Sequence, residues 1–269
     1  QRGGRLRTWG EPGTVDLTLA QDINDFAKIM CCGPSWAARR ISGDVVSPSD
    51  SKHGKNIISA HAGGVINDQG TLLLRGKTWG DVQDFDNALG HEIIIYQDGG
   101  VEIVIVPNTS SPVGFREAVL DRLVQIQDAR AVAFRPPSLT GAILRVDGTA
   151  TCWSHPGGIQ QPPAHFRDLT AVAVGNSTWL GLKTDGTVVA WGTGGDDSKA
   201  LLNVPAFDLP VIAIRADKGS AAAQLSTGEW VGWGDNSSGV VDQIQAIRKA
   251  VDLQFQGLGQ GLLWIEPVE

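Results

Sequence analysis

Residues 170–192 read TAVAVGNSTWLGLKTDGTVVAWG. This segment holds an apolar run, a short loop, a second apolar run, the dipeptide Asp185-Gly186 and a third run that ends in Trp191-Gly192. Asp-Gly between two apolar runs is a strong hairpin signal, because both residues tolerate the positive φ of a type I′ turn. The segment therefore predicts three successive antiparallel strands.

A second copy of this pattern follows it along the chain. Residues 211–234 read VIAIRADKGSAAAQLSTGEWVGWG, with Thr227-Gly228 at the turn and Trp233-Gly234 at the end. Internal similarity spaced by roughly 40 residues is typical of propeller blades. The turn glycine marks each copy, and the sequence places these markers at Gly4, Gly43, Gly70, Gly100, Gly148, Gly186 and Gly228.

The two ends of the chain complement each other. Residues 4–10 match only the last strand of the pattern, whereas residues 250–265 match only the first two strands. A ring of repeats gains from such a division, because the terminal edge strand then pairs with chain from the other end. The sequence predicts an all-β, seven-bladed propeller that forms a single domain over residues 1–269 and closes in this way.

The central copies are irregular. They lack the tryptophan of the third strand, and the copies around Gly70 and Gly100 look too short for a fourth, outer strand. A helical insertion is predicted at residues 114–128, with shorter helical signals at 19–29 and 241–251. The apolar positions of the insertion that share one helical face are Phe115, Val119, Leu123 and Ile126.

These strings resemble the repeat of the regulator of chromosome condensation (RCC1-like) superfamily. The resemblance is greatest to its short-repeat branch, typified by the bacterial β-lactamase inhibitor protein II, and rests on residues 182–192, 203–206 and 231–236. It implies a closed propeller that binds a protein partner on one face. The aromatic ring of that inhibitor is not matched, since the single tyrosine, Tyr96, lies within an expected strand, so inhibition of β-lactamase is not carried over.

Composition limits the other functions. The chain has 22 Lys and Arg against 29 Asp and Glu, a net charge of −7, and no basic tail, which makes nucleic acid an unlikely partner. No apolar stretch approaches the roughly 20 residues that cross a bilayer, so we expect a soluble protein. Cys31, Cys32 and Cys152 form no readable disulfide framework, which slightly favours an intracellular or organellar compartment without settling the location.

The chemistry-bearing residues show no enzymatic pattern. The five histidines have no metal-ligand spacing, and the loop at residues 192–199 follows a strand end rather than opening a helix. The sequence therefore predicts no catalytic residue, no cofactor and no metal site. Two alternatives stay open: a secreted inhibitor, lectin-like binder or enzyme that uses the axial mouth, and, by family analogy alone, a guanine-nucleotide exchange factor.

The favoured function is a non-catalytic scaffold that binds protein partners as a subunit or accessory component of a larger assembly. Its contact face is expected on the loops between the first and second strands of each blade. Trp36 and Trp179 are the strongest candidates, with burial under their loops as the alternative, whereas Trp9, Trp191 and Trp233 are expected to pack between blades. The full predicted face is Trp36, His61, His91, Glu92, Arg135, Asn176, Trp179, Lys218 and Gln260.

Overall fold

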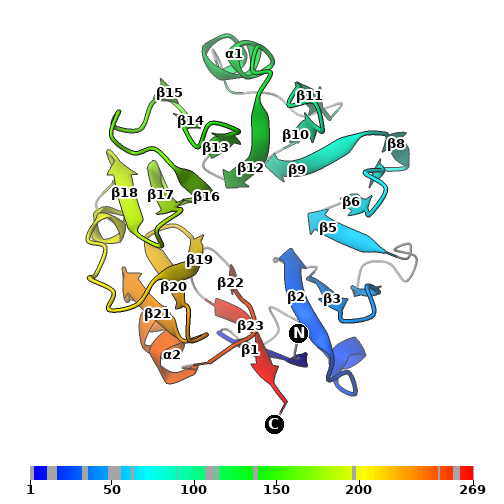
Figure 1. Cartoon of the computed structure of the whole chain (residues 1–269), viewed down its shortest axis with the longest axis vertical. Helices are drawn as coiled ribbons and strands as arrows, with labels where there is room; N and C mark the ends of the chain where they lie inside the picture. The colour runs from blue at the N-terminus through cyan, green and yellow to red at the C-terminus, as the bar shows by residue number, and fades with distance from the viewer. Residues whose placement is uncertain are drawn as a thin grey trace.

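The structure, a computed structural model, describes most of the chain. The described residues are 3–10, 17–31, 36–47, 56–61, 64–88, 90–106, 112, 115–135, 139–195, 198–247, 249–256 and 261–268. Within them the strands form six antiparallel sheets. Figure 1 shows the sheets arranged around a common centre. The strands follow one another in sets of three or four, and the first strand of each set lies nearest the centre.

Five of the sheets have three or four strands each. Two have four strands: β5 (Ile57–His61), β6 (Gly64–Asn67), β7 (Leu72–Leu74), β8 (Lys77–Trp79); and β12 (Ala129–Arg135), β13 (Thr140–Arg145), β14 (Ala150–Ser154), β15 (Gly158–Gln160). Three have three strands: β9 (Val82–Ala88), β10 (His91–Tyr96), β11 (Val101–Ile105); β16 (Leu169–Val174), β17 (Thr178–Lys183), β18 (Val188–Gly192); and β19 (Val211–Ala216), β20 (Ser220–Leu225), β21 (Trp230–Gly234).

The sixth sheet joins the two ends of the chain. Its order is β22 (Leu253–Gln256), β23 (Gly261–Pro267), β1 (Gly4–Trp9), β2 (Phe26–Cys31), β3 (Ala37–Arg40) and β4 (Val45–Val46). The predicted pairing of the ends is present, since β1 and β23 align from Gly4 opposite Pro267 to Trp9 opposite Leu262. By contrast, β1 and β2 share only the pair Gly4 and Phe26.

Tight turns connect the second and third strands of the repeat. Their glycines have φ between 71° and 90°, and each amide donates to the carbonyl three residues earlier, at Gly43, Gly70, Gly99, Gly148, Gly186 and Gly228. Two predicted markers are wrong. Gly4 lies inside β1, where a Cβ would be 2.1 Å from the Glu266 carbonyl oxygen, and the fourth turn uses Gly99 rather than Gly100 because Asp98-Gly99 is its Asp-Gly dipeptide.

The same glycines hold neighbouring sheets together. The carbonyl of a turn glycine accepts a hydrogen bond from the first amide of the next inner strand, so a backbone hydrogen bond links the two sheets. This contact occurs in four copies, at 2.8 Å for Gly70 and Val82, 3.0 Å for Gly99 and Ala129, 2.9 Å for Gly148 and Leu169, and 3.1 Å for Gly186 and Val211.

The helical insertion is present near residues 114–128. A helical turn begins at Phe115 and continues through η2 (Arg116–Leu120), wound as a π-helix, into α1 (Asp121–Leu123). Its apolar face is buried against the sheets on either side, in a cluster that includes Ile93 and Trp153. The exposed fractions on that face are 1% for Phe115, 0% for Val119, 0% for Leu123 and 8% for Ile126.

The other helical expectations have mixed outcomes. The signal at 241–251 corresponds to α2 (Val240–Ile247), but the one at 19–29 is wrong beyond the short η1 (Thr18–Ala20). Residues from Phe26 onward form β2, because pairing with β3 overrides the local helical period. Another 3-10 turn, η3 (Lys199–Leu202), precedes β19.

The expectation that the sheet around Gly70 lacks an outer strand is also wrong. Arg75 and Gly76 adopt φ of 48° and 78°, which turns the chain back at once so that Lys77 pairs with Leu74 in β8.

Candidate functional site

An axial cavity of about 640 Å³ lies where the inner strands meet. Its lining comes from seven strands: β2, β5, β9, β12, β16, β19 and β22. One further lining residue, Asp217, directly follows β19. Each inner strand contributes between one and three residues to the lining, from Asp86 alone in β9 to three consecutive residues in β2. The charged or ionisable side chains in the lining are Lys28, His61, Asp86, Arg135, Arg215 and Asp217.

One ion pair connects the end of β12 to the end of β19. Arg135, the last residue of β12, donates through Nε to Oδ1 of Asp217 at 2.9 Å, with 8% and 13% of the two side chains exposed. Asp217 follows β19, so the pair reaches past β16, which lies between these strands in the ring (Figure 1). The neighbouring loops meet as well, since the Asn176 amide donates to the Lys218 carbonyl at 3.2 Å.

A second group of charges connects β5, β9 and β12. Nδ1 of His61 lies 3.3 Å from Oδ1 of Asp86, whose other oxygen accepts the Phe134 amide at 2.7 Å. Asp84 accepts the Val132 amide at 2.9 Å. Two aspartates of β9 therefore bind the backbone of β12 directly.

The pKa values of this group are displaced by burial and by one another. Desolvation raises the pKa of Asp84 from 3.8 to about 6, opposed by the charge of His61 and the Val132 amide. Desolvation opposes protonation of His61, but the adjacent Asp86 carboxylate outweighs it and raises the pKa of the imidazole above 6.5. Asp84 and His61 therefore both hold their protons more tightly than isolated side chains of their kind.

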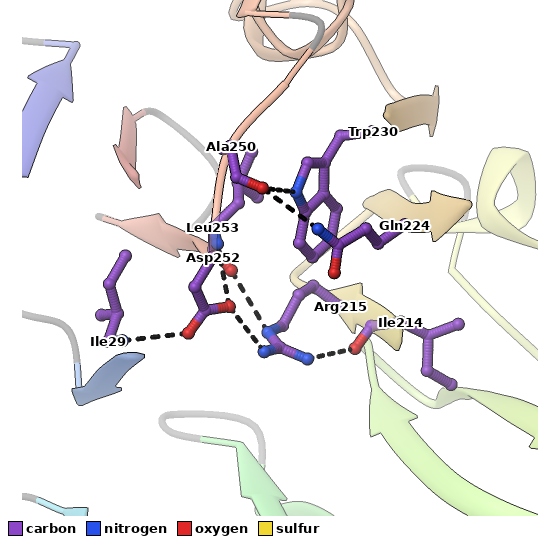
Figure 2. A network of polar contacts seen from close by, with 8 residues as sticks. All are labelled: Ile29, Ile214, Arg215, Gln224, Trp230, Ala250, Asp252 and Leu253. Atoms are coloured by element: carbon purple, nitrogen blue, oxygen red, sulfur yellow. Dashed lines mark hydrogen bonds and ion pairs between the residues drawn. The ribbon is translucent and has the colours of Figure 1, made fainter. Parts of the chain in front are cut away.

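A third network surrounds Asp252, immediately before β22 (Figure 2). One of its oxygens accepts the Ile29 amide of β2 at 2.9 Å, and the other accepts Nη2 of Arg215 from β19 at 2.8 Å. Arg215 also donates to the Leu253 carbonyl and lies 5.8 Å from the ring centre of Trp230, whose indole donates to the Ala250 carbonyl. Asp252 therefore joins the inner strands on both of its sides.

The predicted contact face is only partly accessible. Trp36 and Trp179 are completely buried, so their expected partner contacts are wrong: Trp36 packs edge-on against Phe26, and the Trp179 indole donates to the Gly141 carbonyl at 2.9 Å. His91 and Glu92 are buried too, the first against Phe115 and the second in an ion pair with Arg75.

The remaining members of the predicted face differ in environment. His61 and Arg135 line the cavity, whereas Asn176 and Lys218 are half-buried in adjacent loops. Gln260 lies outside the described residues. Of the three tryptophans expected in the core, Trp191 and Trp233 are buried, each 7% exposed. Trp9 is only half-buried, against the cluster that includes Trp230.

The cavity also contains functional candidates that the sequence reasoning missed, chiefly Lys28, Asp86 and Arg215. For Lys28 and Arg215 the signal is a charged residue inside an otherwise apolar inner strand, whereas β9 is polar at most positions and gives Asp86 no such signal. Within the described part of the chain, no group of three His, Cys, Asp or Glu side chains could hold a metal. Cys152 is a buried free thiol, and desolvation raises its pKa well above the usual range.

Small antiparallel sheets around a lined axis define a β-propeller. The fold of this chain is similar to that of solved RCC1-like propellers. The structure of Prp20p from Saccharomyces cerevisiae, described with its binding to Gsp1p and histones, superposes with a TM-score of 0.66 at 10% identity and covers 100% of this chain and 92% of that one. Yeast RCC1 (Prp20) bound by Kap60 gives 0.64 at 10% identity, with 100% and 90% covered.

Human WBSCR16 is also similar, with a TM-score of 0.58 at 13% identity, covering 90% of this chain and 88% of that one. No family model matches the sequence, and no curated protein matches it. These similarities establish the fold, while the short-repeat branch stays a prediction. None of the helices in the described residues is long and apolar enough to span a membrane.

Proposed function

We propose that this chain is a non-catalytic protein-binding scaffold built as a seven-bladed propeller. Seven inner strands contribute to the cavity lining, which supports seven blades even though hydrogen bonding groups the strands into six sheets. The two counts agree if the six-stranded sheet is divided at the lone pair of Gly4 and Phe26. One blade is then β22, β23 and β1, and the next is β2, β3 and β4.

The binding face in this proposal is the end of the ring where the inner strands finish. The observation that carries it is the set of contacts between those strand ends: Arg135 with Asp217, and Asn176 with Lys218. These contacts fix the loops of neighbouring sheets relative to one another, and a rigid scaffold of this kind is where binding loops concentrate. Trp36 and Trp179 are buried and cannot touch a partner, so the partner contacts in this proposal come from the polar residues of the loops.

A protein is the proposed class of partner. Prp20p, which shares the fold, is described with binding to Gsp1p, histones and Kap60. The net charge of −7 disfavours phosphate backbones, which supports a protein rather than a nucleic acid. The proposal includes membership of a multi-subunit assembly and an intracellular location, the latter supported by the unpaired Cys152.

The proposal is tested by affinity purification from the source cells with mass spectrometry, using the wild type and two lysine variants. Lys218→Glu reverses a charge on the proposed face, whereas Lys183→Glu does so at the end of β17, beside the turn on the opposite end of the sheet. We expect a stoichiometric partner with the wild type and Lys183→Glu, and at least roughly tenfold weaker capture with Lys218→Glu, as for a central interface residue.

Equal loss in both variants, or retention in both, would overturn the assignment of the face. The absence of any stoichiometric partner of the wild type would overturn the scaffold itself. Both variants should keep the melting temperature of the wild type, since neither lysine is buried.

A further inference from the structure

In the part of the chain that the structure describes, Lys28 is the cation of the axial cavity without a direct partner. It belongs to β2, lines the cavity and is accessible to solvent there. Among the residues that the structure describes, its ammonium group has no hydrogen bond or ion pair. Each other cationic side chain of the lining is paired: Arg135 with Asp217, Arg215 with Asp252, and His61 with Asp86.

The carboxylates near Lys28 are already committed elsewhere. Asp252 accepts the Ile29 amide with one oxygen and Arg215 with the other, and Asp84 accepts the Val132 amide. They act on Lys28 only through longer-range attraction, which Arg215 and Arg39 oppose. An ammonium group in such a place gains more from a new acceptor than one that is already bonded.

The balance of charge at Lys28 agrees with this geometry. Desolvation lowers the pKa of Lys28, Asp252 counteracts this, and the nearby Arg215 and Arg39 lower it further. An anion that contacts the ammonium group would favour its charged form and raise the pKa again.

The cavity wall indicates what kind of anion fits. Apolar side chains from β2, β16 and β19 face amide and hydroxyl groups from β5 and β22, and about 640 Å³ is within the usual size of a small-molecule site. The lining, as far as the structure describes it, offers one unpaired cation, which suits one negative charge, while Asp84 and Asp86 would repel a second. The apolar lining includes Met30, Val172, Val174 and Ile214.

We propose that the axial cavity binds a small organic monocarboxylate. Its carboxylate accepts hydrogen bonds from Lys28, and its hydrocarbon part lies against the apolar residues of the lining. The inference is independent of the proposed scaffold function, because partner capture is tested at Lys218 in the loops and carboxylate binding at Lys28 in the cavity.

The first test is calorimetric titration of the full chain with hexanoate, hexanol and inorganic phosphate. We expect one hexanoate to bind per chain, with hexanol at least roughly tenfold weaker because it lacks the charge-assisted hydrogen bond. The Lys28 ε-methylene resonance should shift on addition of hexanoate. No hexanoate binding, equal binding of hexanol, or tighter binding of phosphate would each overturn the proposal.

Variants then connect the binding to Lys28. Lys28→Met should weaken hexanoate binding at least roughly tenfold, while Lys28→Arg should retain most of it by preserving the charge. Lys77→Met is the matched control, because Lys77 is an exposed lysine in the outer strand β8. If Lys28→Met is folded by circular dichroism and still binds hexanoate like the wild type, the proposed site is wrong. Loss of binding in both Lys28→Arg and Lys77→Met would also contradict it.

Discussion

At the scale of the residue, Asp252 and Asp128 show how context decides the value of one side chain. Each lies directly before an inner strand and pairs with an arginine. Asp252 is 8% exposed and also accepts a backbone amide from another strand, whereas Asp128 and its partner Arg145 are both 37% exposed. Burial turns the same chemistry from a minor contact into a major one, because an unpaired group costs far more where water cannot replace its partner.

We expect Asp252→Ala to lower the free energy of unfolding by about 3 kcal/mol, since it removes the acceptor of the Ile29 amide and of Nη2 of Arg215. Asp128→Ala should cost less than about 1 kcal/mol, because its ion pair is half in solvent. Urea denaturation of the two variants beside the wild type measures both values. Similar losses in the two variants would mean that Asp252 does not hold the strands together.

At the scale of the element, the turn glycine has two duties that can be separated. It supplies the positive φ of the hairpin, and in most copies it also lies close to the start of the next inner strand. Gly186 has φ of 82° and a Cβ there would be 2.7 Å from Cβ of Pro210; Gly228 has φ of 87° and open space around it. The two positions therefore differ in packing while sharing a conformation.

Gly228→Ala is expected to cost about 1 kcal/mol of stability, the usual penalty for a side chain at positive φ. Gly186→Ala should cost about 1–3 kcal/mol more, because the new methyl group also pushes the turn away from β19. The difference between their thermal unfolding free energies isolates the contact between sheets. Equal penalties would show that the turn can move without disturbing the neighbouring sheet.

At the scale of the whole molecule, the protonation of Asp84 and His61 contributes to the stability of the folded chain. The folded-state pKa of Asp84 is about 6, above its ordinary 3.8, so the folded chain binds this proton more tightly than the unfolded chain. The contribution of Asp84 to stability is therefore greatest below pH 4 and is lost as the pH rises to about 6. His61 acts in the same direction at higher pH, because its pKa lies above 6.5.

We expect Asp84→Asn to reduce the loss of stability between pH 4 and pH 6 while keeping an acceptor for the Val132 amide. Asp185→Asn is the control, since bonds from Thr187 lower the pKa of that exposed carboxyl, and its contribution has the opposite sign. Denaturant unfolding at several pH values provides the comparison. If the unfolding free energy of Asp84→Asn changed with pH as steeply as that of the wild type, the Asp84 carboxyl would not be the source of the pH dependence.

The repeat pattern could be predicted because hairpin glycines and strand-ending tryptophans are local signals that recur. The cavity could not, because its pairs join distant parts of the chain: Arg135 and Asp217 are separated by 82 positions. Trp36 and Trp179 misled for a related reason. Both tryptophans were expected in exposed loops, but their burial depends on other strands. Trp36 packs against Phe26 of β2, and Trp179, which lies within β17, donates to the Gly141 carbonyl of the neighbouring sheet.

The pairing of β1 with β23 also determines when the sheet can be completed during synthesis of the chain. Arg7 and Glu266 face each other as an ion pair although they are 259 positions apart. Among the strands that the structure describes, β1 is made before all the others and its full-length partner β23 after all the others. Until β23 emerges, the described partner of β1 is β2, through Gly4 and Phe26. The nascent protein therefore carries an open strand edge from the synthesis of β1 until that of β23, and such an edge is prone to pair with other chains.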